Sequence, residues 1–510
     1  MTDSAADGYG LTHVPSGVLG LDQVLRGGFF SGGVYIIRGA PGAGKTILAN
    51  QICFRHAEAG GRALYVTLLS ESHARMMQHM ERLSFYNPDT IPSRLYFVSG
   101  FNALEEDGLR GLMTLLRREV RNHRASLLVL DGLLAVEESS GSDREFRKFI
   151  HEFQAYASAE NCIALLLTNG SRRDYHPEHT MVDGLITLED VRFGKRAQRE
   201  LEVRKFRGSG SLRGRHPFRI SDQGVTVYPR VETVYGLLGP EEEDHVGDAR
   251  VSTGAPELDR LLGGGLQQGT TTLLLGASGS GKTTLGTQFL AQASAEHPAL
   301  HFGFYETPMR LMANARTLEL PLERLHAEGA LHILWRSPTE QMLDDLGHLL
   351  IETVEQRGIK RLFVDGIGGF MEAADLPSRV PSVFSALSNE LRKRDVTTLY
   401  TAETSNLVGP SVFSPLDGLS AIADGLVLLR YVEAGAHLHR LLSVLKMRGG
   451  SFDAAVREFT IGKGGVDVFT DGETAAALLG LGTVQTGTPF GQVRATPRPD
   501  SAPTTLPDGG

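Results

Sequence analysis

The chain has 510 residues, which is too long for one compact core and is typical of two or more domains. Apolar residues make up 41% and charged residues 22%, as in ordinary globular proteins, so the composition excludes a chain that is disordered throughout. The 51 Lys and Arg residues against 60 Asp and Glu residues give a net charge of −9, which supplies no overall attraction to nucleic acid or to an acidic membrane.

The start of the chain, MTDSAADGYGL, has neither the positive charge nor the apolar run of a signal peptide. No apolar stretch approaches the length of about 18–20 residues that a membrane span needs. The only two cysteines, Cys53 and Cys162, lie in apolar stretches without a C-x-x-C pair, which predicts reduced core residues. We therefore expect a cytoplasmic protein with no membrane association.

The first motif along the chain is GAPGAGKT at residues 39–46, which matches G-x-x-x-x-G-K-[ST]. It follows VYIIR, an apolar run that predicts a strand, and precedes ILANQICFRHA, which predicts a helix. Backbone N–H groups of such a loop surround phosphate oxygens, its lysine reaches the β and γ phosphates, and its hydroxyl binds Mg²⁺. The predicted nucleotide-binding residues are Gly39, Ala40, Pro41, Gly42, Ala43, Gly44, Lys45 and Thr46.

Two carboxylates follow predicted strands in the same half of the chain. YVTLLSES places Glu71 just beyond a strand, where a carboxylate could orient the water that attacks a phosphate, although glutamates at strand ends are also common surface residues. SLLVLD ends at Asp131, which we expect to hold Mg²⁺ or its waters, although it could merely cap a turn.

The rest of this half predicts further helices and strands. In LRGLMTLLRREVRNHR, residues 109–124, apolar residues recur at helical spacing, so its arginines are expected on a solvated face rather than in a DNA-binding stripe. CIALLLT predicts another strand. The run DYHPEHT places His176 and His179 beside Glu178 in a proline-containing loop without a matching partner cluster, which favours a polar loop over zinc.

A charged and glycine-containing stretch, GPEEEDHVGDAR at residues 239–250, predicts a linker. Beyond it the first pattern is repeated, with GASGSGKT at residues 276–283 between an apolar strand and a helix. Glu306 in FGFYETP and Asp365 at the end of RLFVD repeat the two carboxylates, and the single Trp335 is expected at a strand end. The second set of predicted nucleotide-binding residues is Gly276, Ala277, Ser278, Gly279, Ser280, Gly281, Lys282, Thr283 and Thr284.

Equivalent residues of the two halves keep a nearly constant separation. Lys45 and Lys282 are 237 residues apart, Asp131 and Asp365 are 234 apart, and Arg207 and Arg448 are 241 apart, which indicates a duplicated domain. Continuous apolar strands alternating with helical segments predict an α/β fold with a mostly parallel sheet covered by helices on both faces. In each copy, Mg²⁺ is assigned to Thr46 with Asp131 and to Thr283 with Asp365.

We expect a first domain over residues 1–238, a linker over 239–250, a second domain over 251–478 and a C-terminal tail over 479–510. The tail is rich in Gly, Thr and Pro and ends in TPRPDSAPTTLPDGG, so it is predicted to be disordered and could dock a partner.

With these motifs the chain resembles the KaiC-like family, double-domain ATPases of the RecA superfamily. The resemblance reaches to about residue 475 and is strongest in LRYVEAGAHLHRLLSVLKMRGGSFDAAVREFTI. It implies two tandem RecA-like P-loop domains, ATP and Mg²⁺ as ligands, and six subunits in a double ring with ATP between neighbours. It also implies that two K-x-R-G motifs reach the nucleotide of the adjacent subunit, through Lys205, Arg207, Lys446 and Arg448.

The chain departs from the pattern of the clock members of this family. They carry two adjacent glutamates where this chain has Ser70-Glu71 and Tyr305-Glu306, and neighbouring Ser and Thr phosphoacceptors where it has Ser420 and Ala421. Alanine cannot accept a phosphoryl group, so a two-site phosphorylation cycle of that form is excluded, while transfer to Ser420 alone remains open.

The resemblance implies an ATPase that phosphorylates its own Ser420 and acts as a signalling or timing switch, with a clock-type protein partner docking on the tail. It further implies a structural ATPase role for the first domain and a regulatory or kinase role for the second. Two alternatives remain. A RecA-type DNA-handling ATPase would need basic loops lining a pore, and the acidic total argues against it. A nucleotide-gated scaffold without kinase activity would use slow turnover to recruit a partner.

Overall fold

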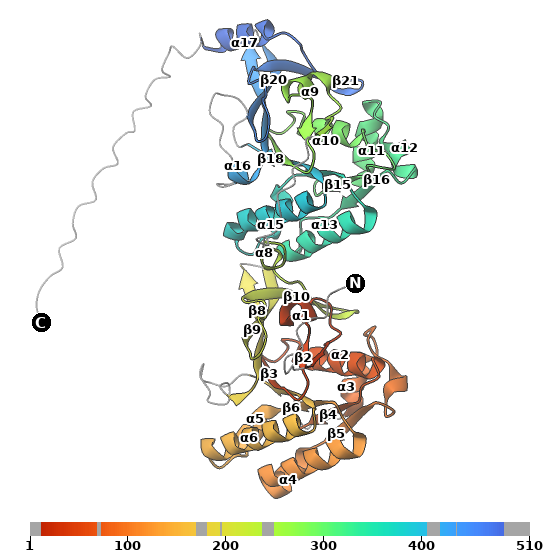
Figure 1. Ribbon diagram of the computed structural model, residues 1–510, viewed down its shortest axis with the longest axis vertical. Helices are drawn as coiled ribbons and strands as arrows, with labels where there is room; N and C mark the ends of the chain where they lie inside the picture. The colour runs from red at the N-terminus through yellow and green to blue at the C-terminus, as the bar shows by residue number, and fades with distance from the viewer. Residues whose placement is uncertain are drawn as a thin grey trace, which may run out of the picture.

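The computed structural model describes residues 12–68, 73–169, 181–193, 196–236, 249–404, 419–434 and 436–483. These residues form two α/β domains stacked along the long axis of the molecule, as Figure 1 shows. The predicted fold class is confirmed, because each domain has a nine-stranded and largely parallel sheet with helices on both faces.

The sheet of the first domain has the strand order β11-β10-β9-β8-β3-β7-β6-β4-β5. The run from β8 to β5 is parallel, and β9 to β11 add antiparallel strands at one edge. The strands are β3 (Val34–Gly39), β4 (Ala63–Thr67), β5 (Leu95–Ser99), β6 (Leu127–Asp131), β7 (Ile163–Thr168), β8 (Gly184–Phe193), β9 (Arg196–Phe206), β10 (Arg215–Ser221) and β11 (Gly224–Val227).

Helices cover the two faces of this sheet as the continuous apolar strands predict. Alternate residues of β3 point to opposite faces, so Tyr35 and Ile37 pack with α2, whereas Val34 and Ile36 pack with α4 and α6. The helices are α1 (Leu21–Leu25), α2 (Lys45–Glu58), α3 (His73–Met80), α4 (Phe101–His123), α5 (Leu133–Glu138) and α6 (Asp143–Ala159), and β1 (His13–Val14) pairs with β2 (Phe29–Phe30) beside them. Cys53 and Cys162 are free thiols in the two cores, as expected.

The second domain repeats this order strand for strand, as β22-β21-β20-β19-β14-β18-β17-β15-β16. Its strands are β14 (Thr271–Gly276), β15 (Ala299–Gly303), β16 (Leu331–Trp335), β17 (Arg361–Asp365), β18 (Thr397–Glu403), β19 (Gly425–Ala434), β20 (His437–Met447), β21 (Arg457–Gly462) and β22 (Gly465–Val468), with β12 (Arg250–Val251) paired to β13 (Leu266–Gln267). The helices are α9 (Pro256–Leu261), α10 (Lys282–Leu290), α11 (Pro308–Thr317), α12 (Leu322–Ala327), α13 (Leu343–Arg357), α14 (Gly368–Ala373), α15 (Val380–Lys393), α16 (Leu419–Ile422) and α17 (Glu473–Thr483).

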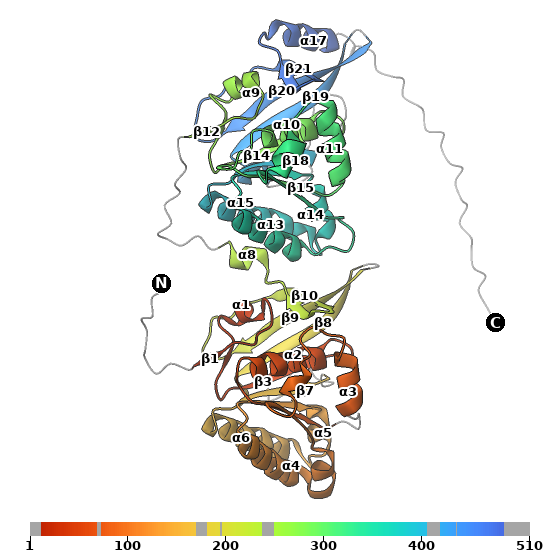
Figure 2. The same ribbon diagram turned by 90° about the vertical axis from the view of Figure 1, so that its right-hand side faces the viewer.

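A short helix, α8 (Val231–Val234), joins the two domains (Figure 2). Val231 is buried in the core of the second domain, and its backbone N–H donates to Asp344 Oδ1 at 2.9 Å. Arg379 bonds the same Asp344 at 2.8 Å and Glu232 of α8 at 3.0 Å. The last residues of the expected first domain therefore pack on the second one.

Helix α17 extends to Thr483, so residues 479–483 of the expected tail are helical, and the tail from residue 484 lies outside the described residues, as does most of the expected linker. Among the helices that the structure describes, none is long and apolar enough to cross a membrane.

Candidate functional site

The two phosphate loops lie at the carboxyl ends of β3 and β14, between each strand and the helix that follows it. Gly44 and Gly281 precede these helices with φ angles of 102° and 107°, which side chains of L residues rarely adopt. A Cβ at Gly44 would also lie 2.6 Å from Ile220 Cδ1, and one at Gly281 would lie 2.9 Å from Ile461 Cδ1. Only glycine therefore fits these positions, which lie at the helix N-terminus where backbone N–H groups can bind an anion.

The loop lysines curl back over their own loops in the same way in both domains. Lys45 Nζ donates to Gly39 O at 2.7 Å and to Ala40 O at 3.0 Å. Lys282 Nζ donates to Gly276 O at 2.7 Å and to Ala277 O at 2.8 Å. Burial lowers the pKa of both ammonium groups, and the nearby carboxylates oppose that shift. Each lysine is thus placed over the cradle where phosphate oxygens would lie.

The hydroxyl of each loop threonine lies beside the aspartate that the sequence assigns to Mg²⁺. Thr46 Oγ1 lies 3.4 Å from Asp131 Oδ2, and Thr283 Oγ1 lies 3.2 Å and 3.0 Å from the two carboxylate oxygens of Asp365. Burial raises the pKa of Asp365, while the bond from Thr283 opposes the shift. A hydroxyl beside one carboxylate fits Mg²⁺, because this ion usually takes one or two protein oxygens and fills its remaining positions with water and phosphate oxygens.

Two groups that hold these aspartates were missed at the sequence level. Tyr65 Oη donates to Asp131 Oδ2 at 2.6 Å, and Thr401 Oγ1 bonds Asp365 Oδ1 at 3.0 Å. Both side chains come from strands that neighbour the aspartate's strand in the sheet but lie tens of residues away in the chain. An alignment of the two copies strand by strand makes Tyr65 of β4 equivalent to His301 of β15, because each is the third residue of its strand.

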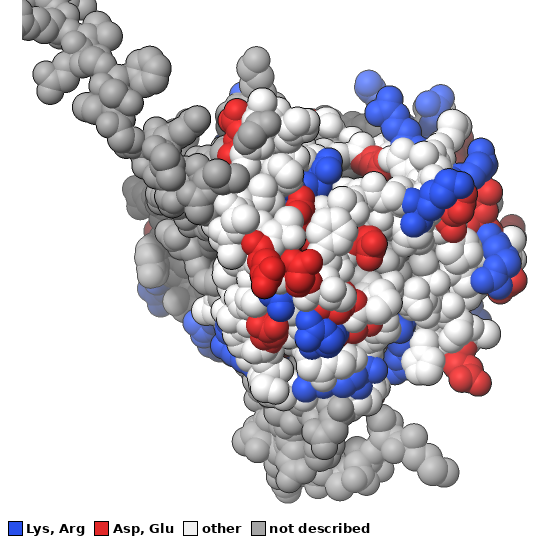
Figure 3. All heavy atoms as spheres, turned by 90° about the horizontal axis from the view of Figure 1, so that it is seen from above, with Lys and Arg blue, Asp and Glu red and all other residues white. Residues whose placement is uncertain are grey.

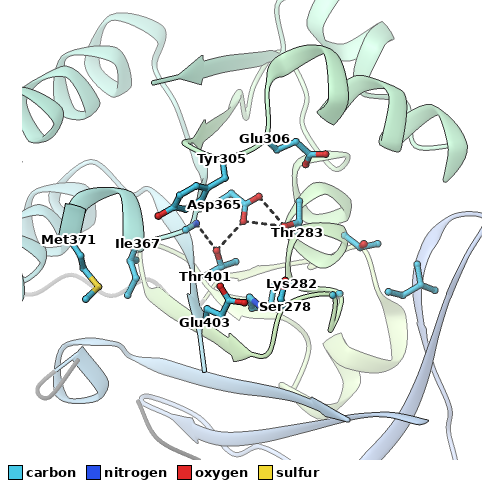
Figure 4. Close-up of a pocket in the computed structure, with 16 residues that line it drawn as sticks. Ser278, Lys282, Thr283, Tyr305, Glu306, Asp365, Ile367, Met371, Thr401 and Glu403 are labelled. Atoms are coloured by element: carbon cyan, nitrogen blue, oxygen red, sulfur yellow. Dashed lines mark hydrogen bonds between the residues drawn. The ribbon is translucent and has the colours of Figure 1, made fainter. Parts of the chain in front are cut away.

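The second domain has a cavity of about 480 Å³ beside its phosphate loop (Figure 4). Glu306 lines it and accepts a hydrogen bond from Asn314 Nδ2. Burial, and next the charge of Asp365, raise the pKa of Glu306, and a raised pKa suits a carboxylate that is to accept a proton. Tyr305 and Glu403 line the same cavity, and Tyr305 Oη donates to Glu372 at 2.9 Å. Glu71, the equivalent carboxylate of the first domain, lies outside the described residues.

The K-x-R-G motifs lie at the opposite end of each sheet from the phosphate loop. Arg207 follows β9, and its backbone N–H donates to Asp183 O at 2.8 Å; Asp183 Oδ2 in turn accepts from the N–H of Val34, the first residue of β3. The loop begins at Gly39, five residues further on, which is about 17 Å along a strand. Arg207 and its own phosphate loop are therefore too far apart to act on one phosphate.

In the second domain the K-x-R-G motif also bonds the backbone of α16 and of the residue that follows it. Lys446 Nζ donates to Ala423 O at 2.7 Å, and Arg448 Nη2 donates to Ala421 O at 2.8 Å. Arg448 also lies 3.7 Å from Asp424. Burial lowers the pKa of Lys446, and the charge of Arg448 adds to this shift. Ser420 lies in α16, although its side chain is outside the described part.

The remaining sequence candidates are a histidine-containing loop and the single tryptophan. The loop with His176, Glu178 and His179 lies outside the described residues, and within the described ones no cluster of three His, Cys, Asp or Glu side chains could hold a metal ion. Trp335 lies at the end of β16, as expected. Figure 3 shows the far end of the second domain, where the described Lys and Arg side chains alternate with Asp and Glu side chains and form no continuous basic patch.

Comparison with known proteins gives a consistent result across both domains. Residues 14–232 and 251–473 match the sequence profile of the family described as ATPase: KaiC. The chain is 26% identical over 488 residues to the circadian clock protein KaiC3 of Synechocystis sp., covering 92% of this chain and 93% of that protein. It is 25% identical over 477 residues to the circadian clock oscillator protein KaiC of Picosynechococcus sp., with 90% of each chain covered.

Proposed function

The chain belongs to the KaiC ATPase family, and from that premise we propose that it hydrolyses ATP in both domains within a homohexameric double ring and transfers phosphate to its own Ser420. In this proposal the assembly acts as a signalling or timing switch, as the names of the relatives suggest for those proteins. ATP and Mg²⁺ are the ligands of each phosphate loop.

The position of the K-x-R-G motifs carries the argument for assembly. Arg207 lies at the opposite end of the sheet from its own phosphate loop, and the matched strand order gives Arg448 the same place in the second domain. A cation supplied by a neighbouring subunit would neutralise the charge that builds on the transferred phosphoryl group. If nucleotides lie at the interfaces of a ring, each of the two arginines would contact the nucleotide that is bound by the neighbouring subunit.

The groups around the second loop support hydrolysis there. Mg²⁺, when bound at Thr283 and Asp365, would neutralise charge on the β and γ phosphates. Glu306 accepts a proton from the attacking water as the new bond to the γ phosphorus forms, and the bond from that phosphorus to the bridging oxygen breaks, releasing ADP and phosphate. Lys282 lies where it would stabilise the charge on the leaving group.

The contacts of α16 support phosphoryl transfer to Ser420. Arg448 bonds the backbone of α16 and Lys446 bonds the residue that follows it, so the cations that would reach the neighbour's nucleotide also anchor the segment that carries Ser420. In this transfer the serine oxygen replaces water as the nucleophile, loses its proton to a base, and receives the γ phosphoryl group from ATP while ADP leaves.

Native mass spectrometry and phosphate release test the proposed function together. With Mg²⁺ and ATP, we expect a particle of six times the chain mass of 55.2 kDa and steady release of phosphate. Lys45→Ala and Lys282→Ala should each lower phosphate release, and the double variant should abolish it. Full phosphate release by the double variant, or turnover by a monomer, would refute the proposal.

A further inference from the structure

The two nucleotide sites differ in charge at one position of the sheet. In the second domain, β18 ends at Glu403, which pairs in register with Gly276, the first residue of the phosphate loop. In the first domain, β7 ends at Thr168, which pairs with Arg38, so Asn169 is the residue next to Gly39. The same place beside the loop therefore holds a carboxylate in one copy and a neutral amide in the other.

The side chain of Glu403 faces the cavity in which the phosphates of a nucleotide would bind. Its side chain is exposed and lines the cavity, close to Lys282 and Ser278 in Figure 4. Lys282 Nζ is held on the carbonyl of Gly276, the residue that Glu403 faces across the strand pair. The charge of Glu403 raises the pKa of Lys282 against the larger lowering by burial, which is consistent with this proximity.

Glu306 and Glu403 hold different places around the loop. Glu306 lies two residues before α11 and is bonded to Asn314, beyond Asp365, whereas Glu403 lies on the side of Lys282 (Figure 4). The backbone next to Glu403 is fixed independently of its side chain, because Thr404 N–H donates to Gly276 O at 3.2 Å. An exposed carboxylate with no role in this backbone contact is free to act on a ligand.

We propose that Glu403 sets the preference of the second site between nucleoside triphosphate and diphosphate. Its carboxylate repels the γ phosphate and competes with it for Lys282, whereas a diphosphate lacks the group that is repelled. Asn169 presents no charge, so the first site binds the triphosphate more tightly relative to the diphosphate than the second site does. At one ratio of ATP to ADP the two sites of a chain are then loaded differently, and the second site responds to changes in that ratio.

The inference rests on the proposed binding of ATP, so its test measures binding rather than turnover. The full chain with Lys45→Ala restricts nucleotide binding to the second site, and calorimetry in Mg²⁺ gives its affinities for ADP and for a non-hydrolysable ATP analogue. Adding Glu403→Gln should raise the ratio of analogue affinity to ADP affinity by about ten-fold, since one repulsive charge is removed. Glu403→Asp, which keeps the charge, should leave the ratio near that of the Lys45→Ala parent.

The first site provides the reciprocal control. In a Lys282→Ala background, Asn169→Glu should lower the same ratio at the first site. Equal changes in both affinities, or an unchanged ratio after Glu403→Gln, would overturn the role of Glu403. Failure of the Lys45→Ala parent to bind either nucleotide would instead refute nucleotide binding at the second site, so the two failures are distinguishable.

Discussion

Mixing two inactive variants should restore ATP turnover if the K-x-R-G cations act between subunits. One variant carries Lys282→Ala, which removes the loop lysine, and the other carries Arg448→Ala. Both also carry Arg207→Ala, so that turnover in the first domain is suppressed by removal of its own trans-acting arginine. Each variant alone lacks one of the two groups at every interface of the second ring.

The size of the recovery follows from the geometry. An interface of a mixed ring works only when its loop comes from the Arg448→Ala subunit and its arginine from the Lys282→Ala subunit. At equal amounts, about one quarter of the interfaces meet this condition, so phosphate release should reach about a quarter of that of the Arg207→Ala protein. An arginine acting within its own chain predicts no recovery, because no chain then holds both groups.

Phosphate release is measured after ATP-driven subunit exchange, and native mass spectrometry of a tagged variant confirms that mixed rings have formed. Mixed rings whose turnover equals the average of the two separate variants would refute action between subunits. That result would also remove the argument for a double ring that rests on the position of the K-x-R-G motifs.

Three further predictions concern stability and the first loop. His301 is buried and its pKa is lowered to about 4 by burial, so the unfolded chain takes up a proton before the folded one and the fold loses about 3 kcal/mol of stability as pH falls from 6.5 to 4. The free energy of unfolding in urea should be lower at pH 4.5 than at pH 7.5 by about this amount. The difference between the two pH values should be smaller for the His301→Leu variant. Arg379→Ala removes the cation that pairs with the buried Asp344 and should destabilise the second domain by about 3–5 kcal/mol in urea unfolding, whereas Arg316→Ala, which breaks an exposed pair, should have little effect. Gly44→Ala forces a side chain into a φ of 102° and should weaken nucleotide binding at the first site in calorimetry while the second site is unchanged.

The duplicated fold and both phosphate loops could be predicted from the sequence because their signals are local. A strand, a glycine-rich turn and a helix follow each other within some twenty residues, and Asp131 and Asp365 each end an apolar run. Aligning the two copies then extends these local signals over the whole chain. Glu71 lies outside the described residues, so its role stays a prediction.

The groups that support the loops could not be predicted from one motif. Thr401 and Glu403 reach the second loop from β18, more than a hundred residues further along the chain, because β18 neighbours β14 in the sheet. The contact of Arg379 with Asp344 and Glu232 joins three separate segments at the domain junction. Such contacts depend on strand order and domain packing, which apolar periodicity alone does not determine.

The most direct test of the proposed function follows phosphate labelled at the γ position of ATP into free phosphate and into protein. With Mg²⁺, we expect label in both, and Ser420→Ala should remove the label from the protein while free phosphate continues to form. Ser443→Ala, which changes a buried serine of β20, serves as the matched control and should keep the protein label. Label that persists on the Ser420→Ala protein, or free phosphate with no label on the wild-type chain, would contradict phosphoryl transfer to Ser420.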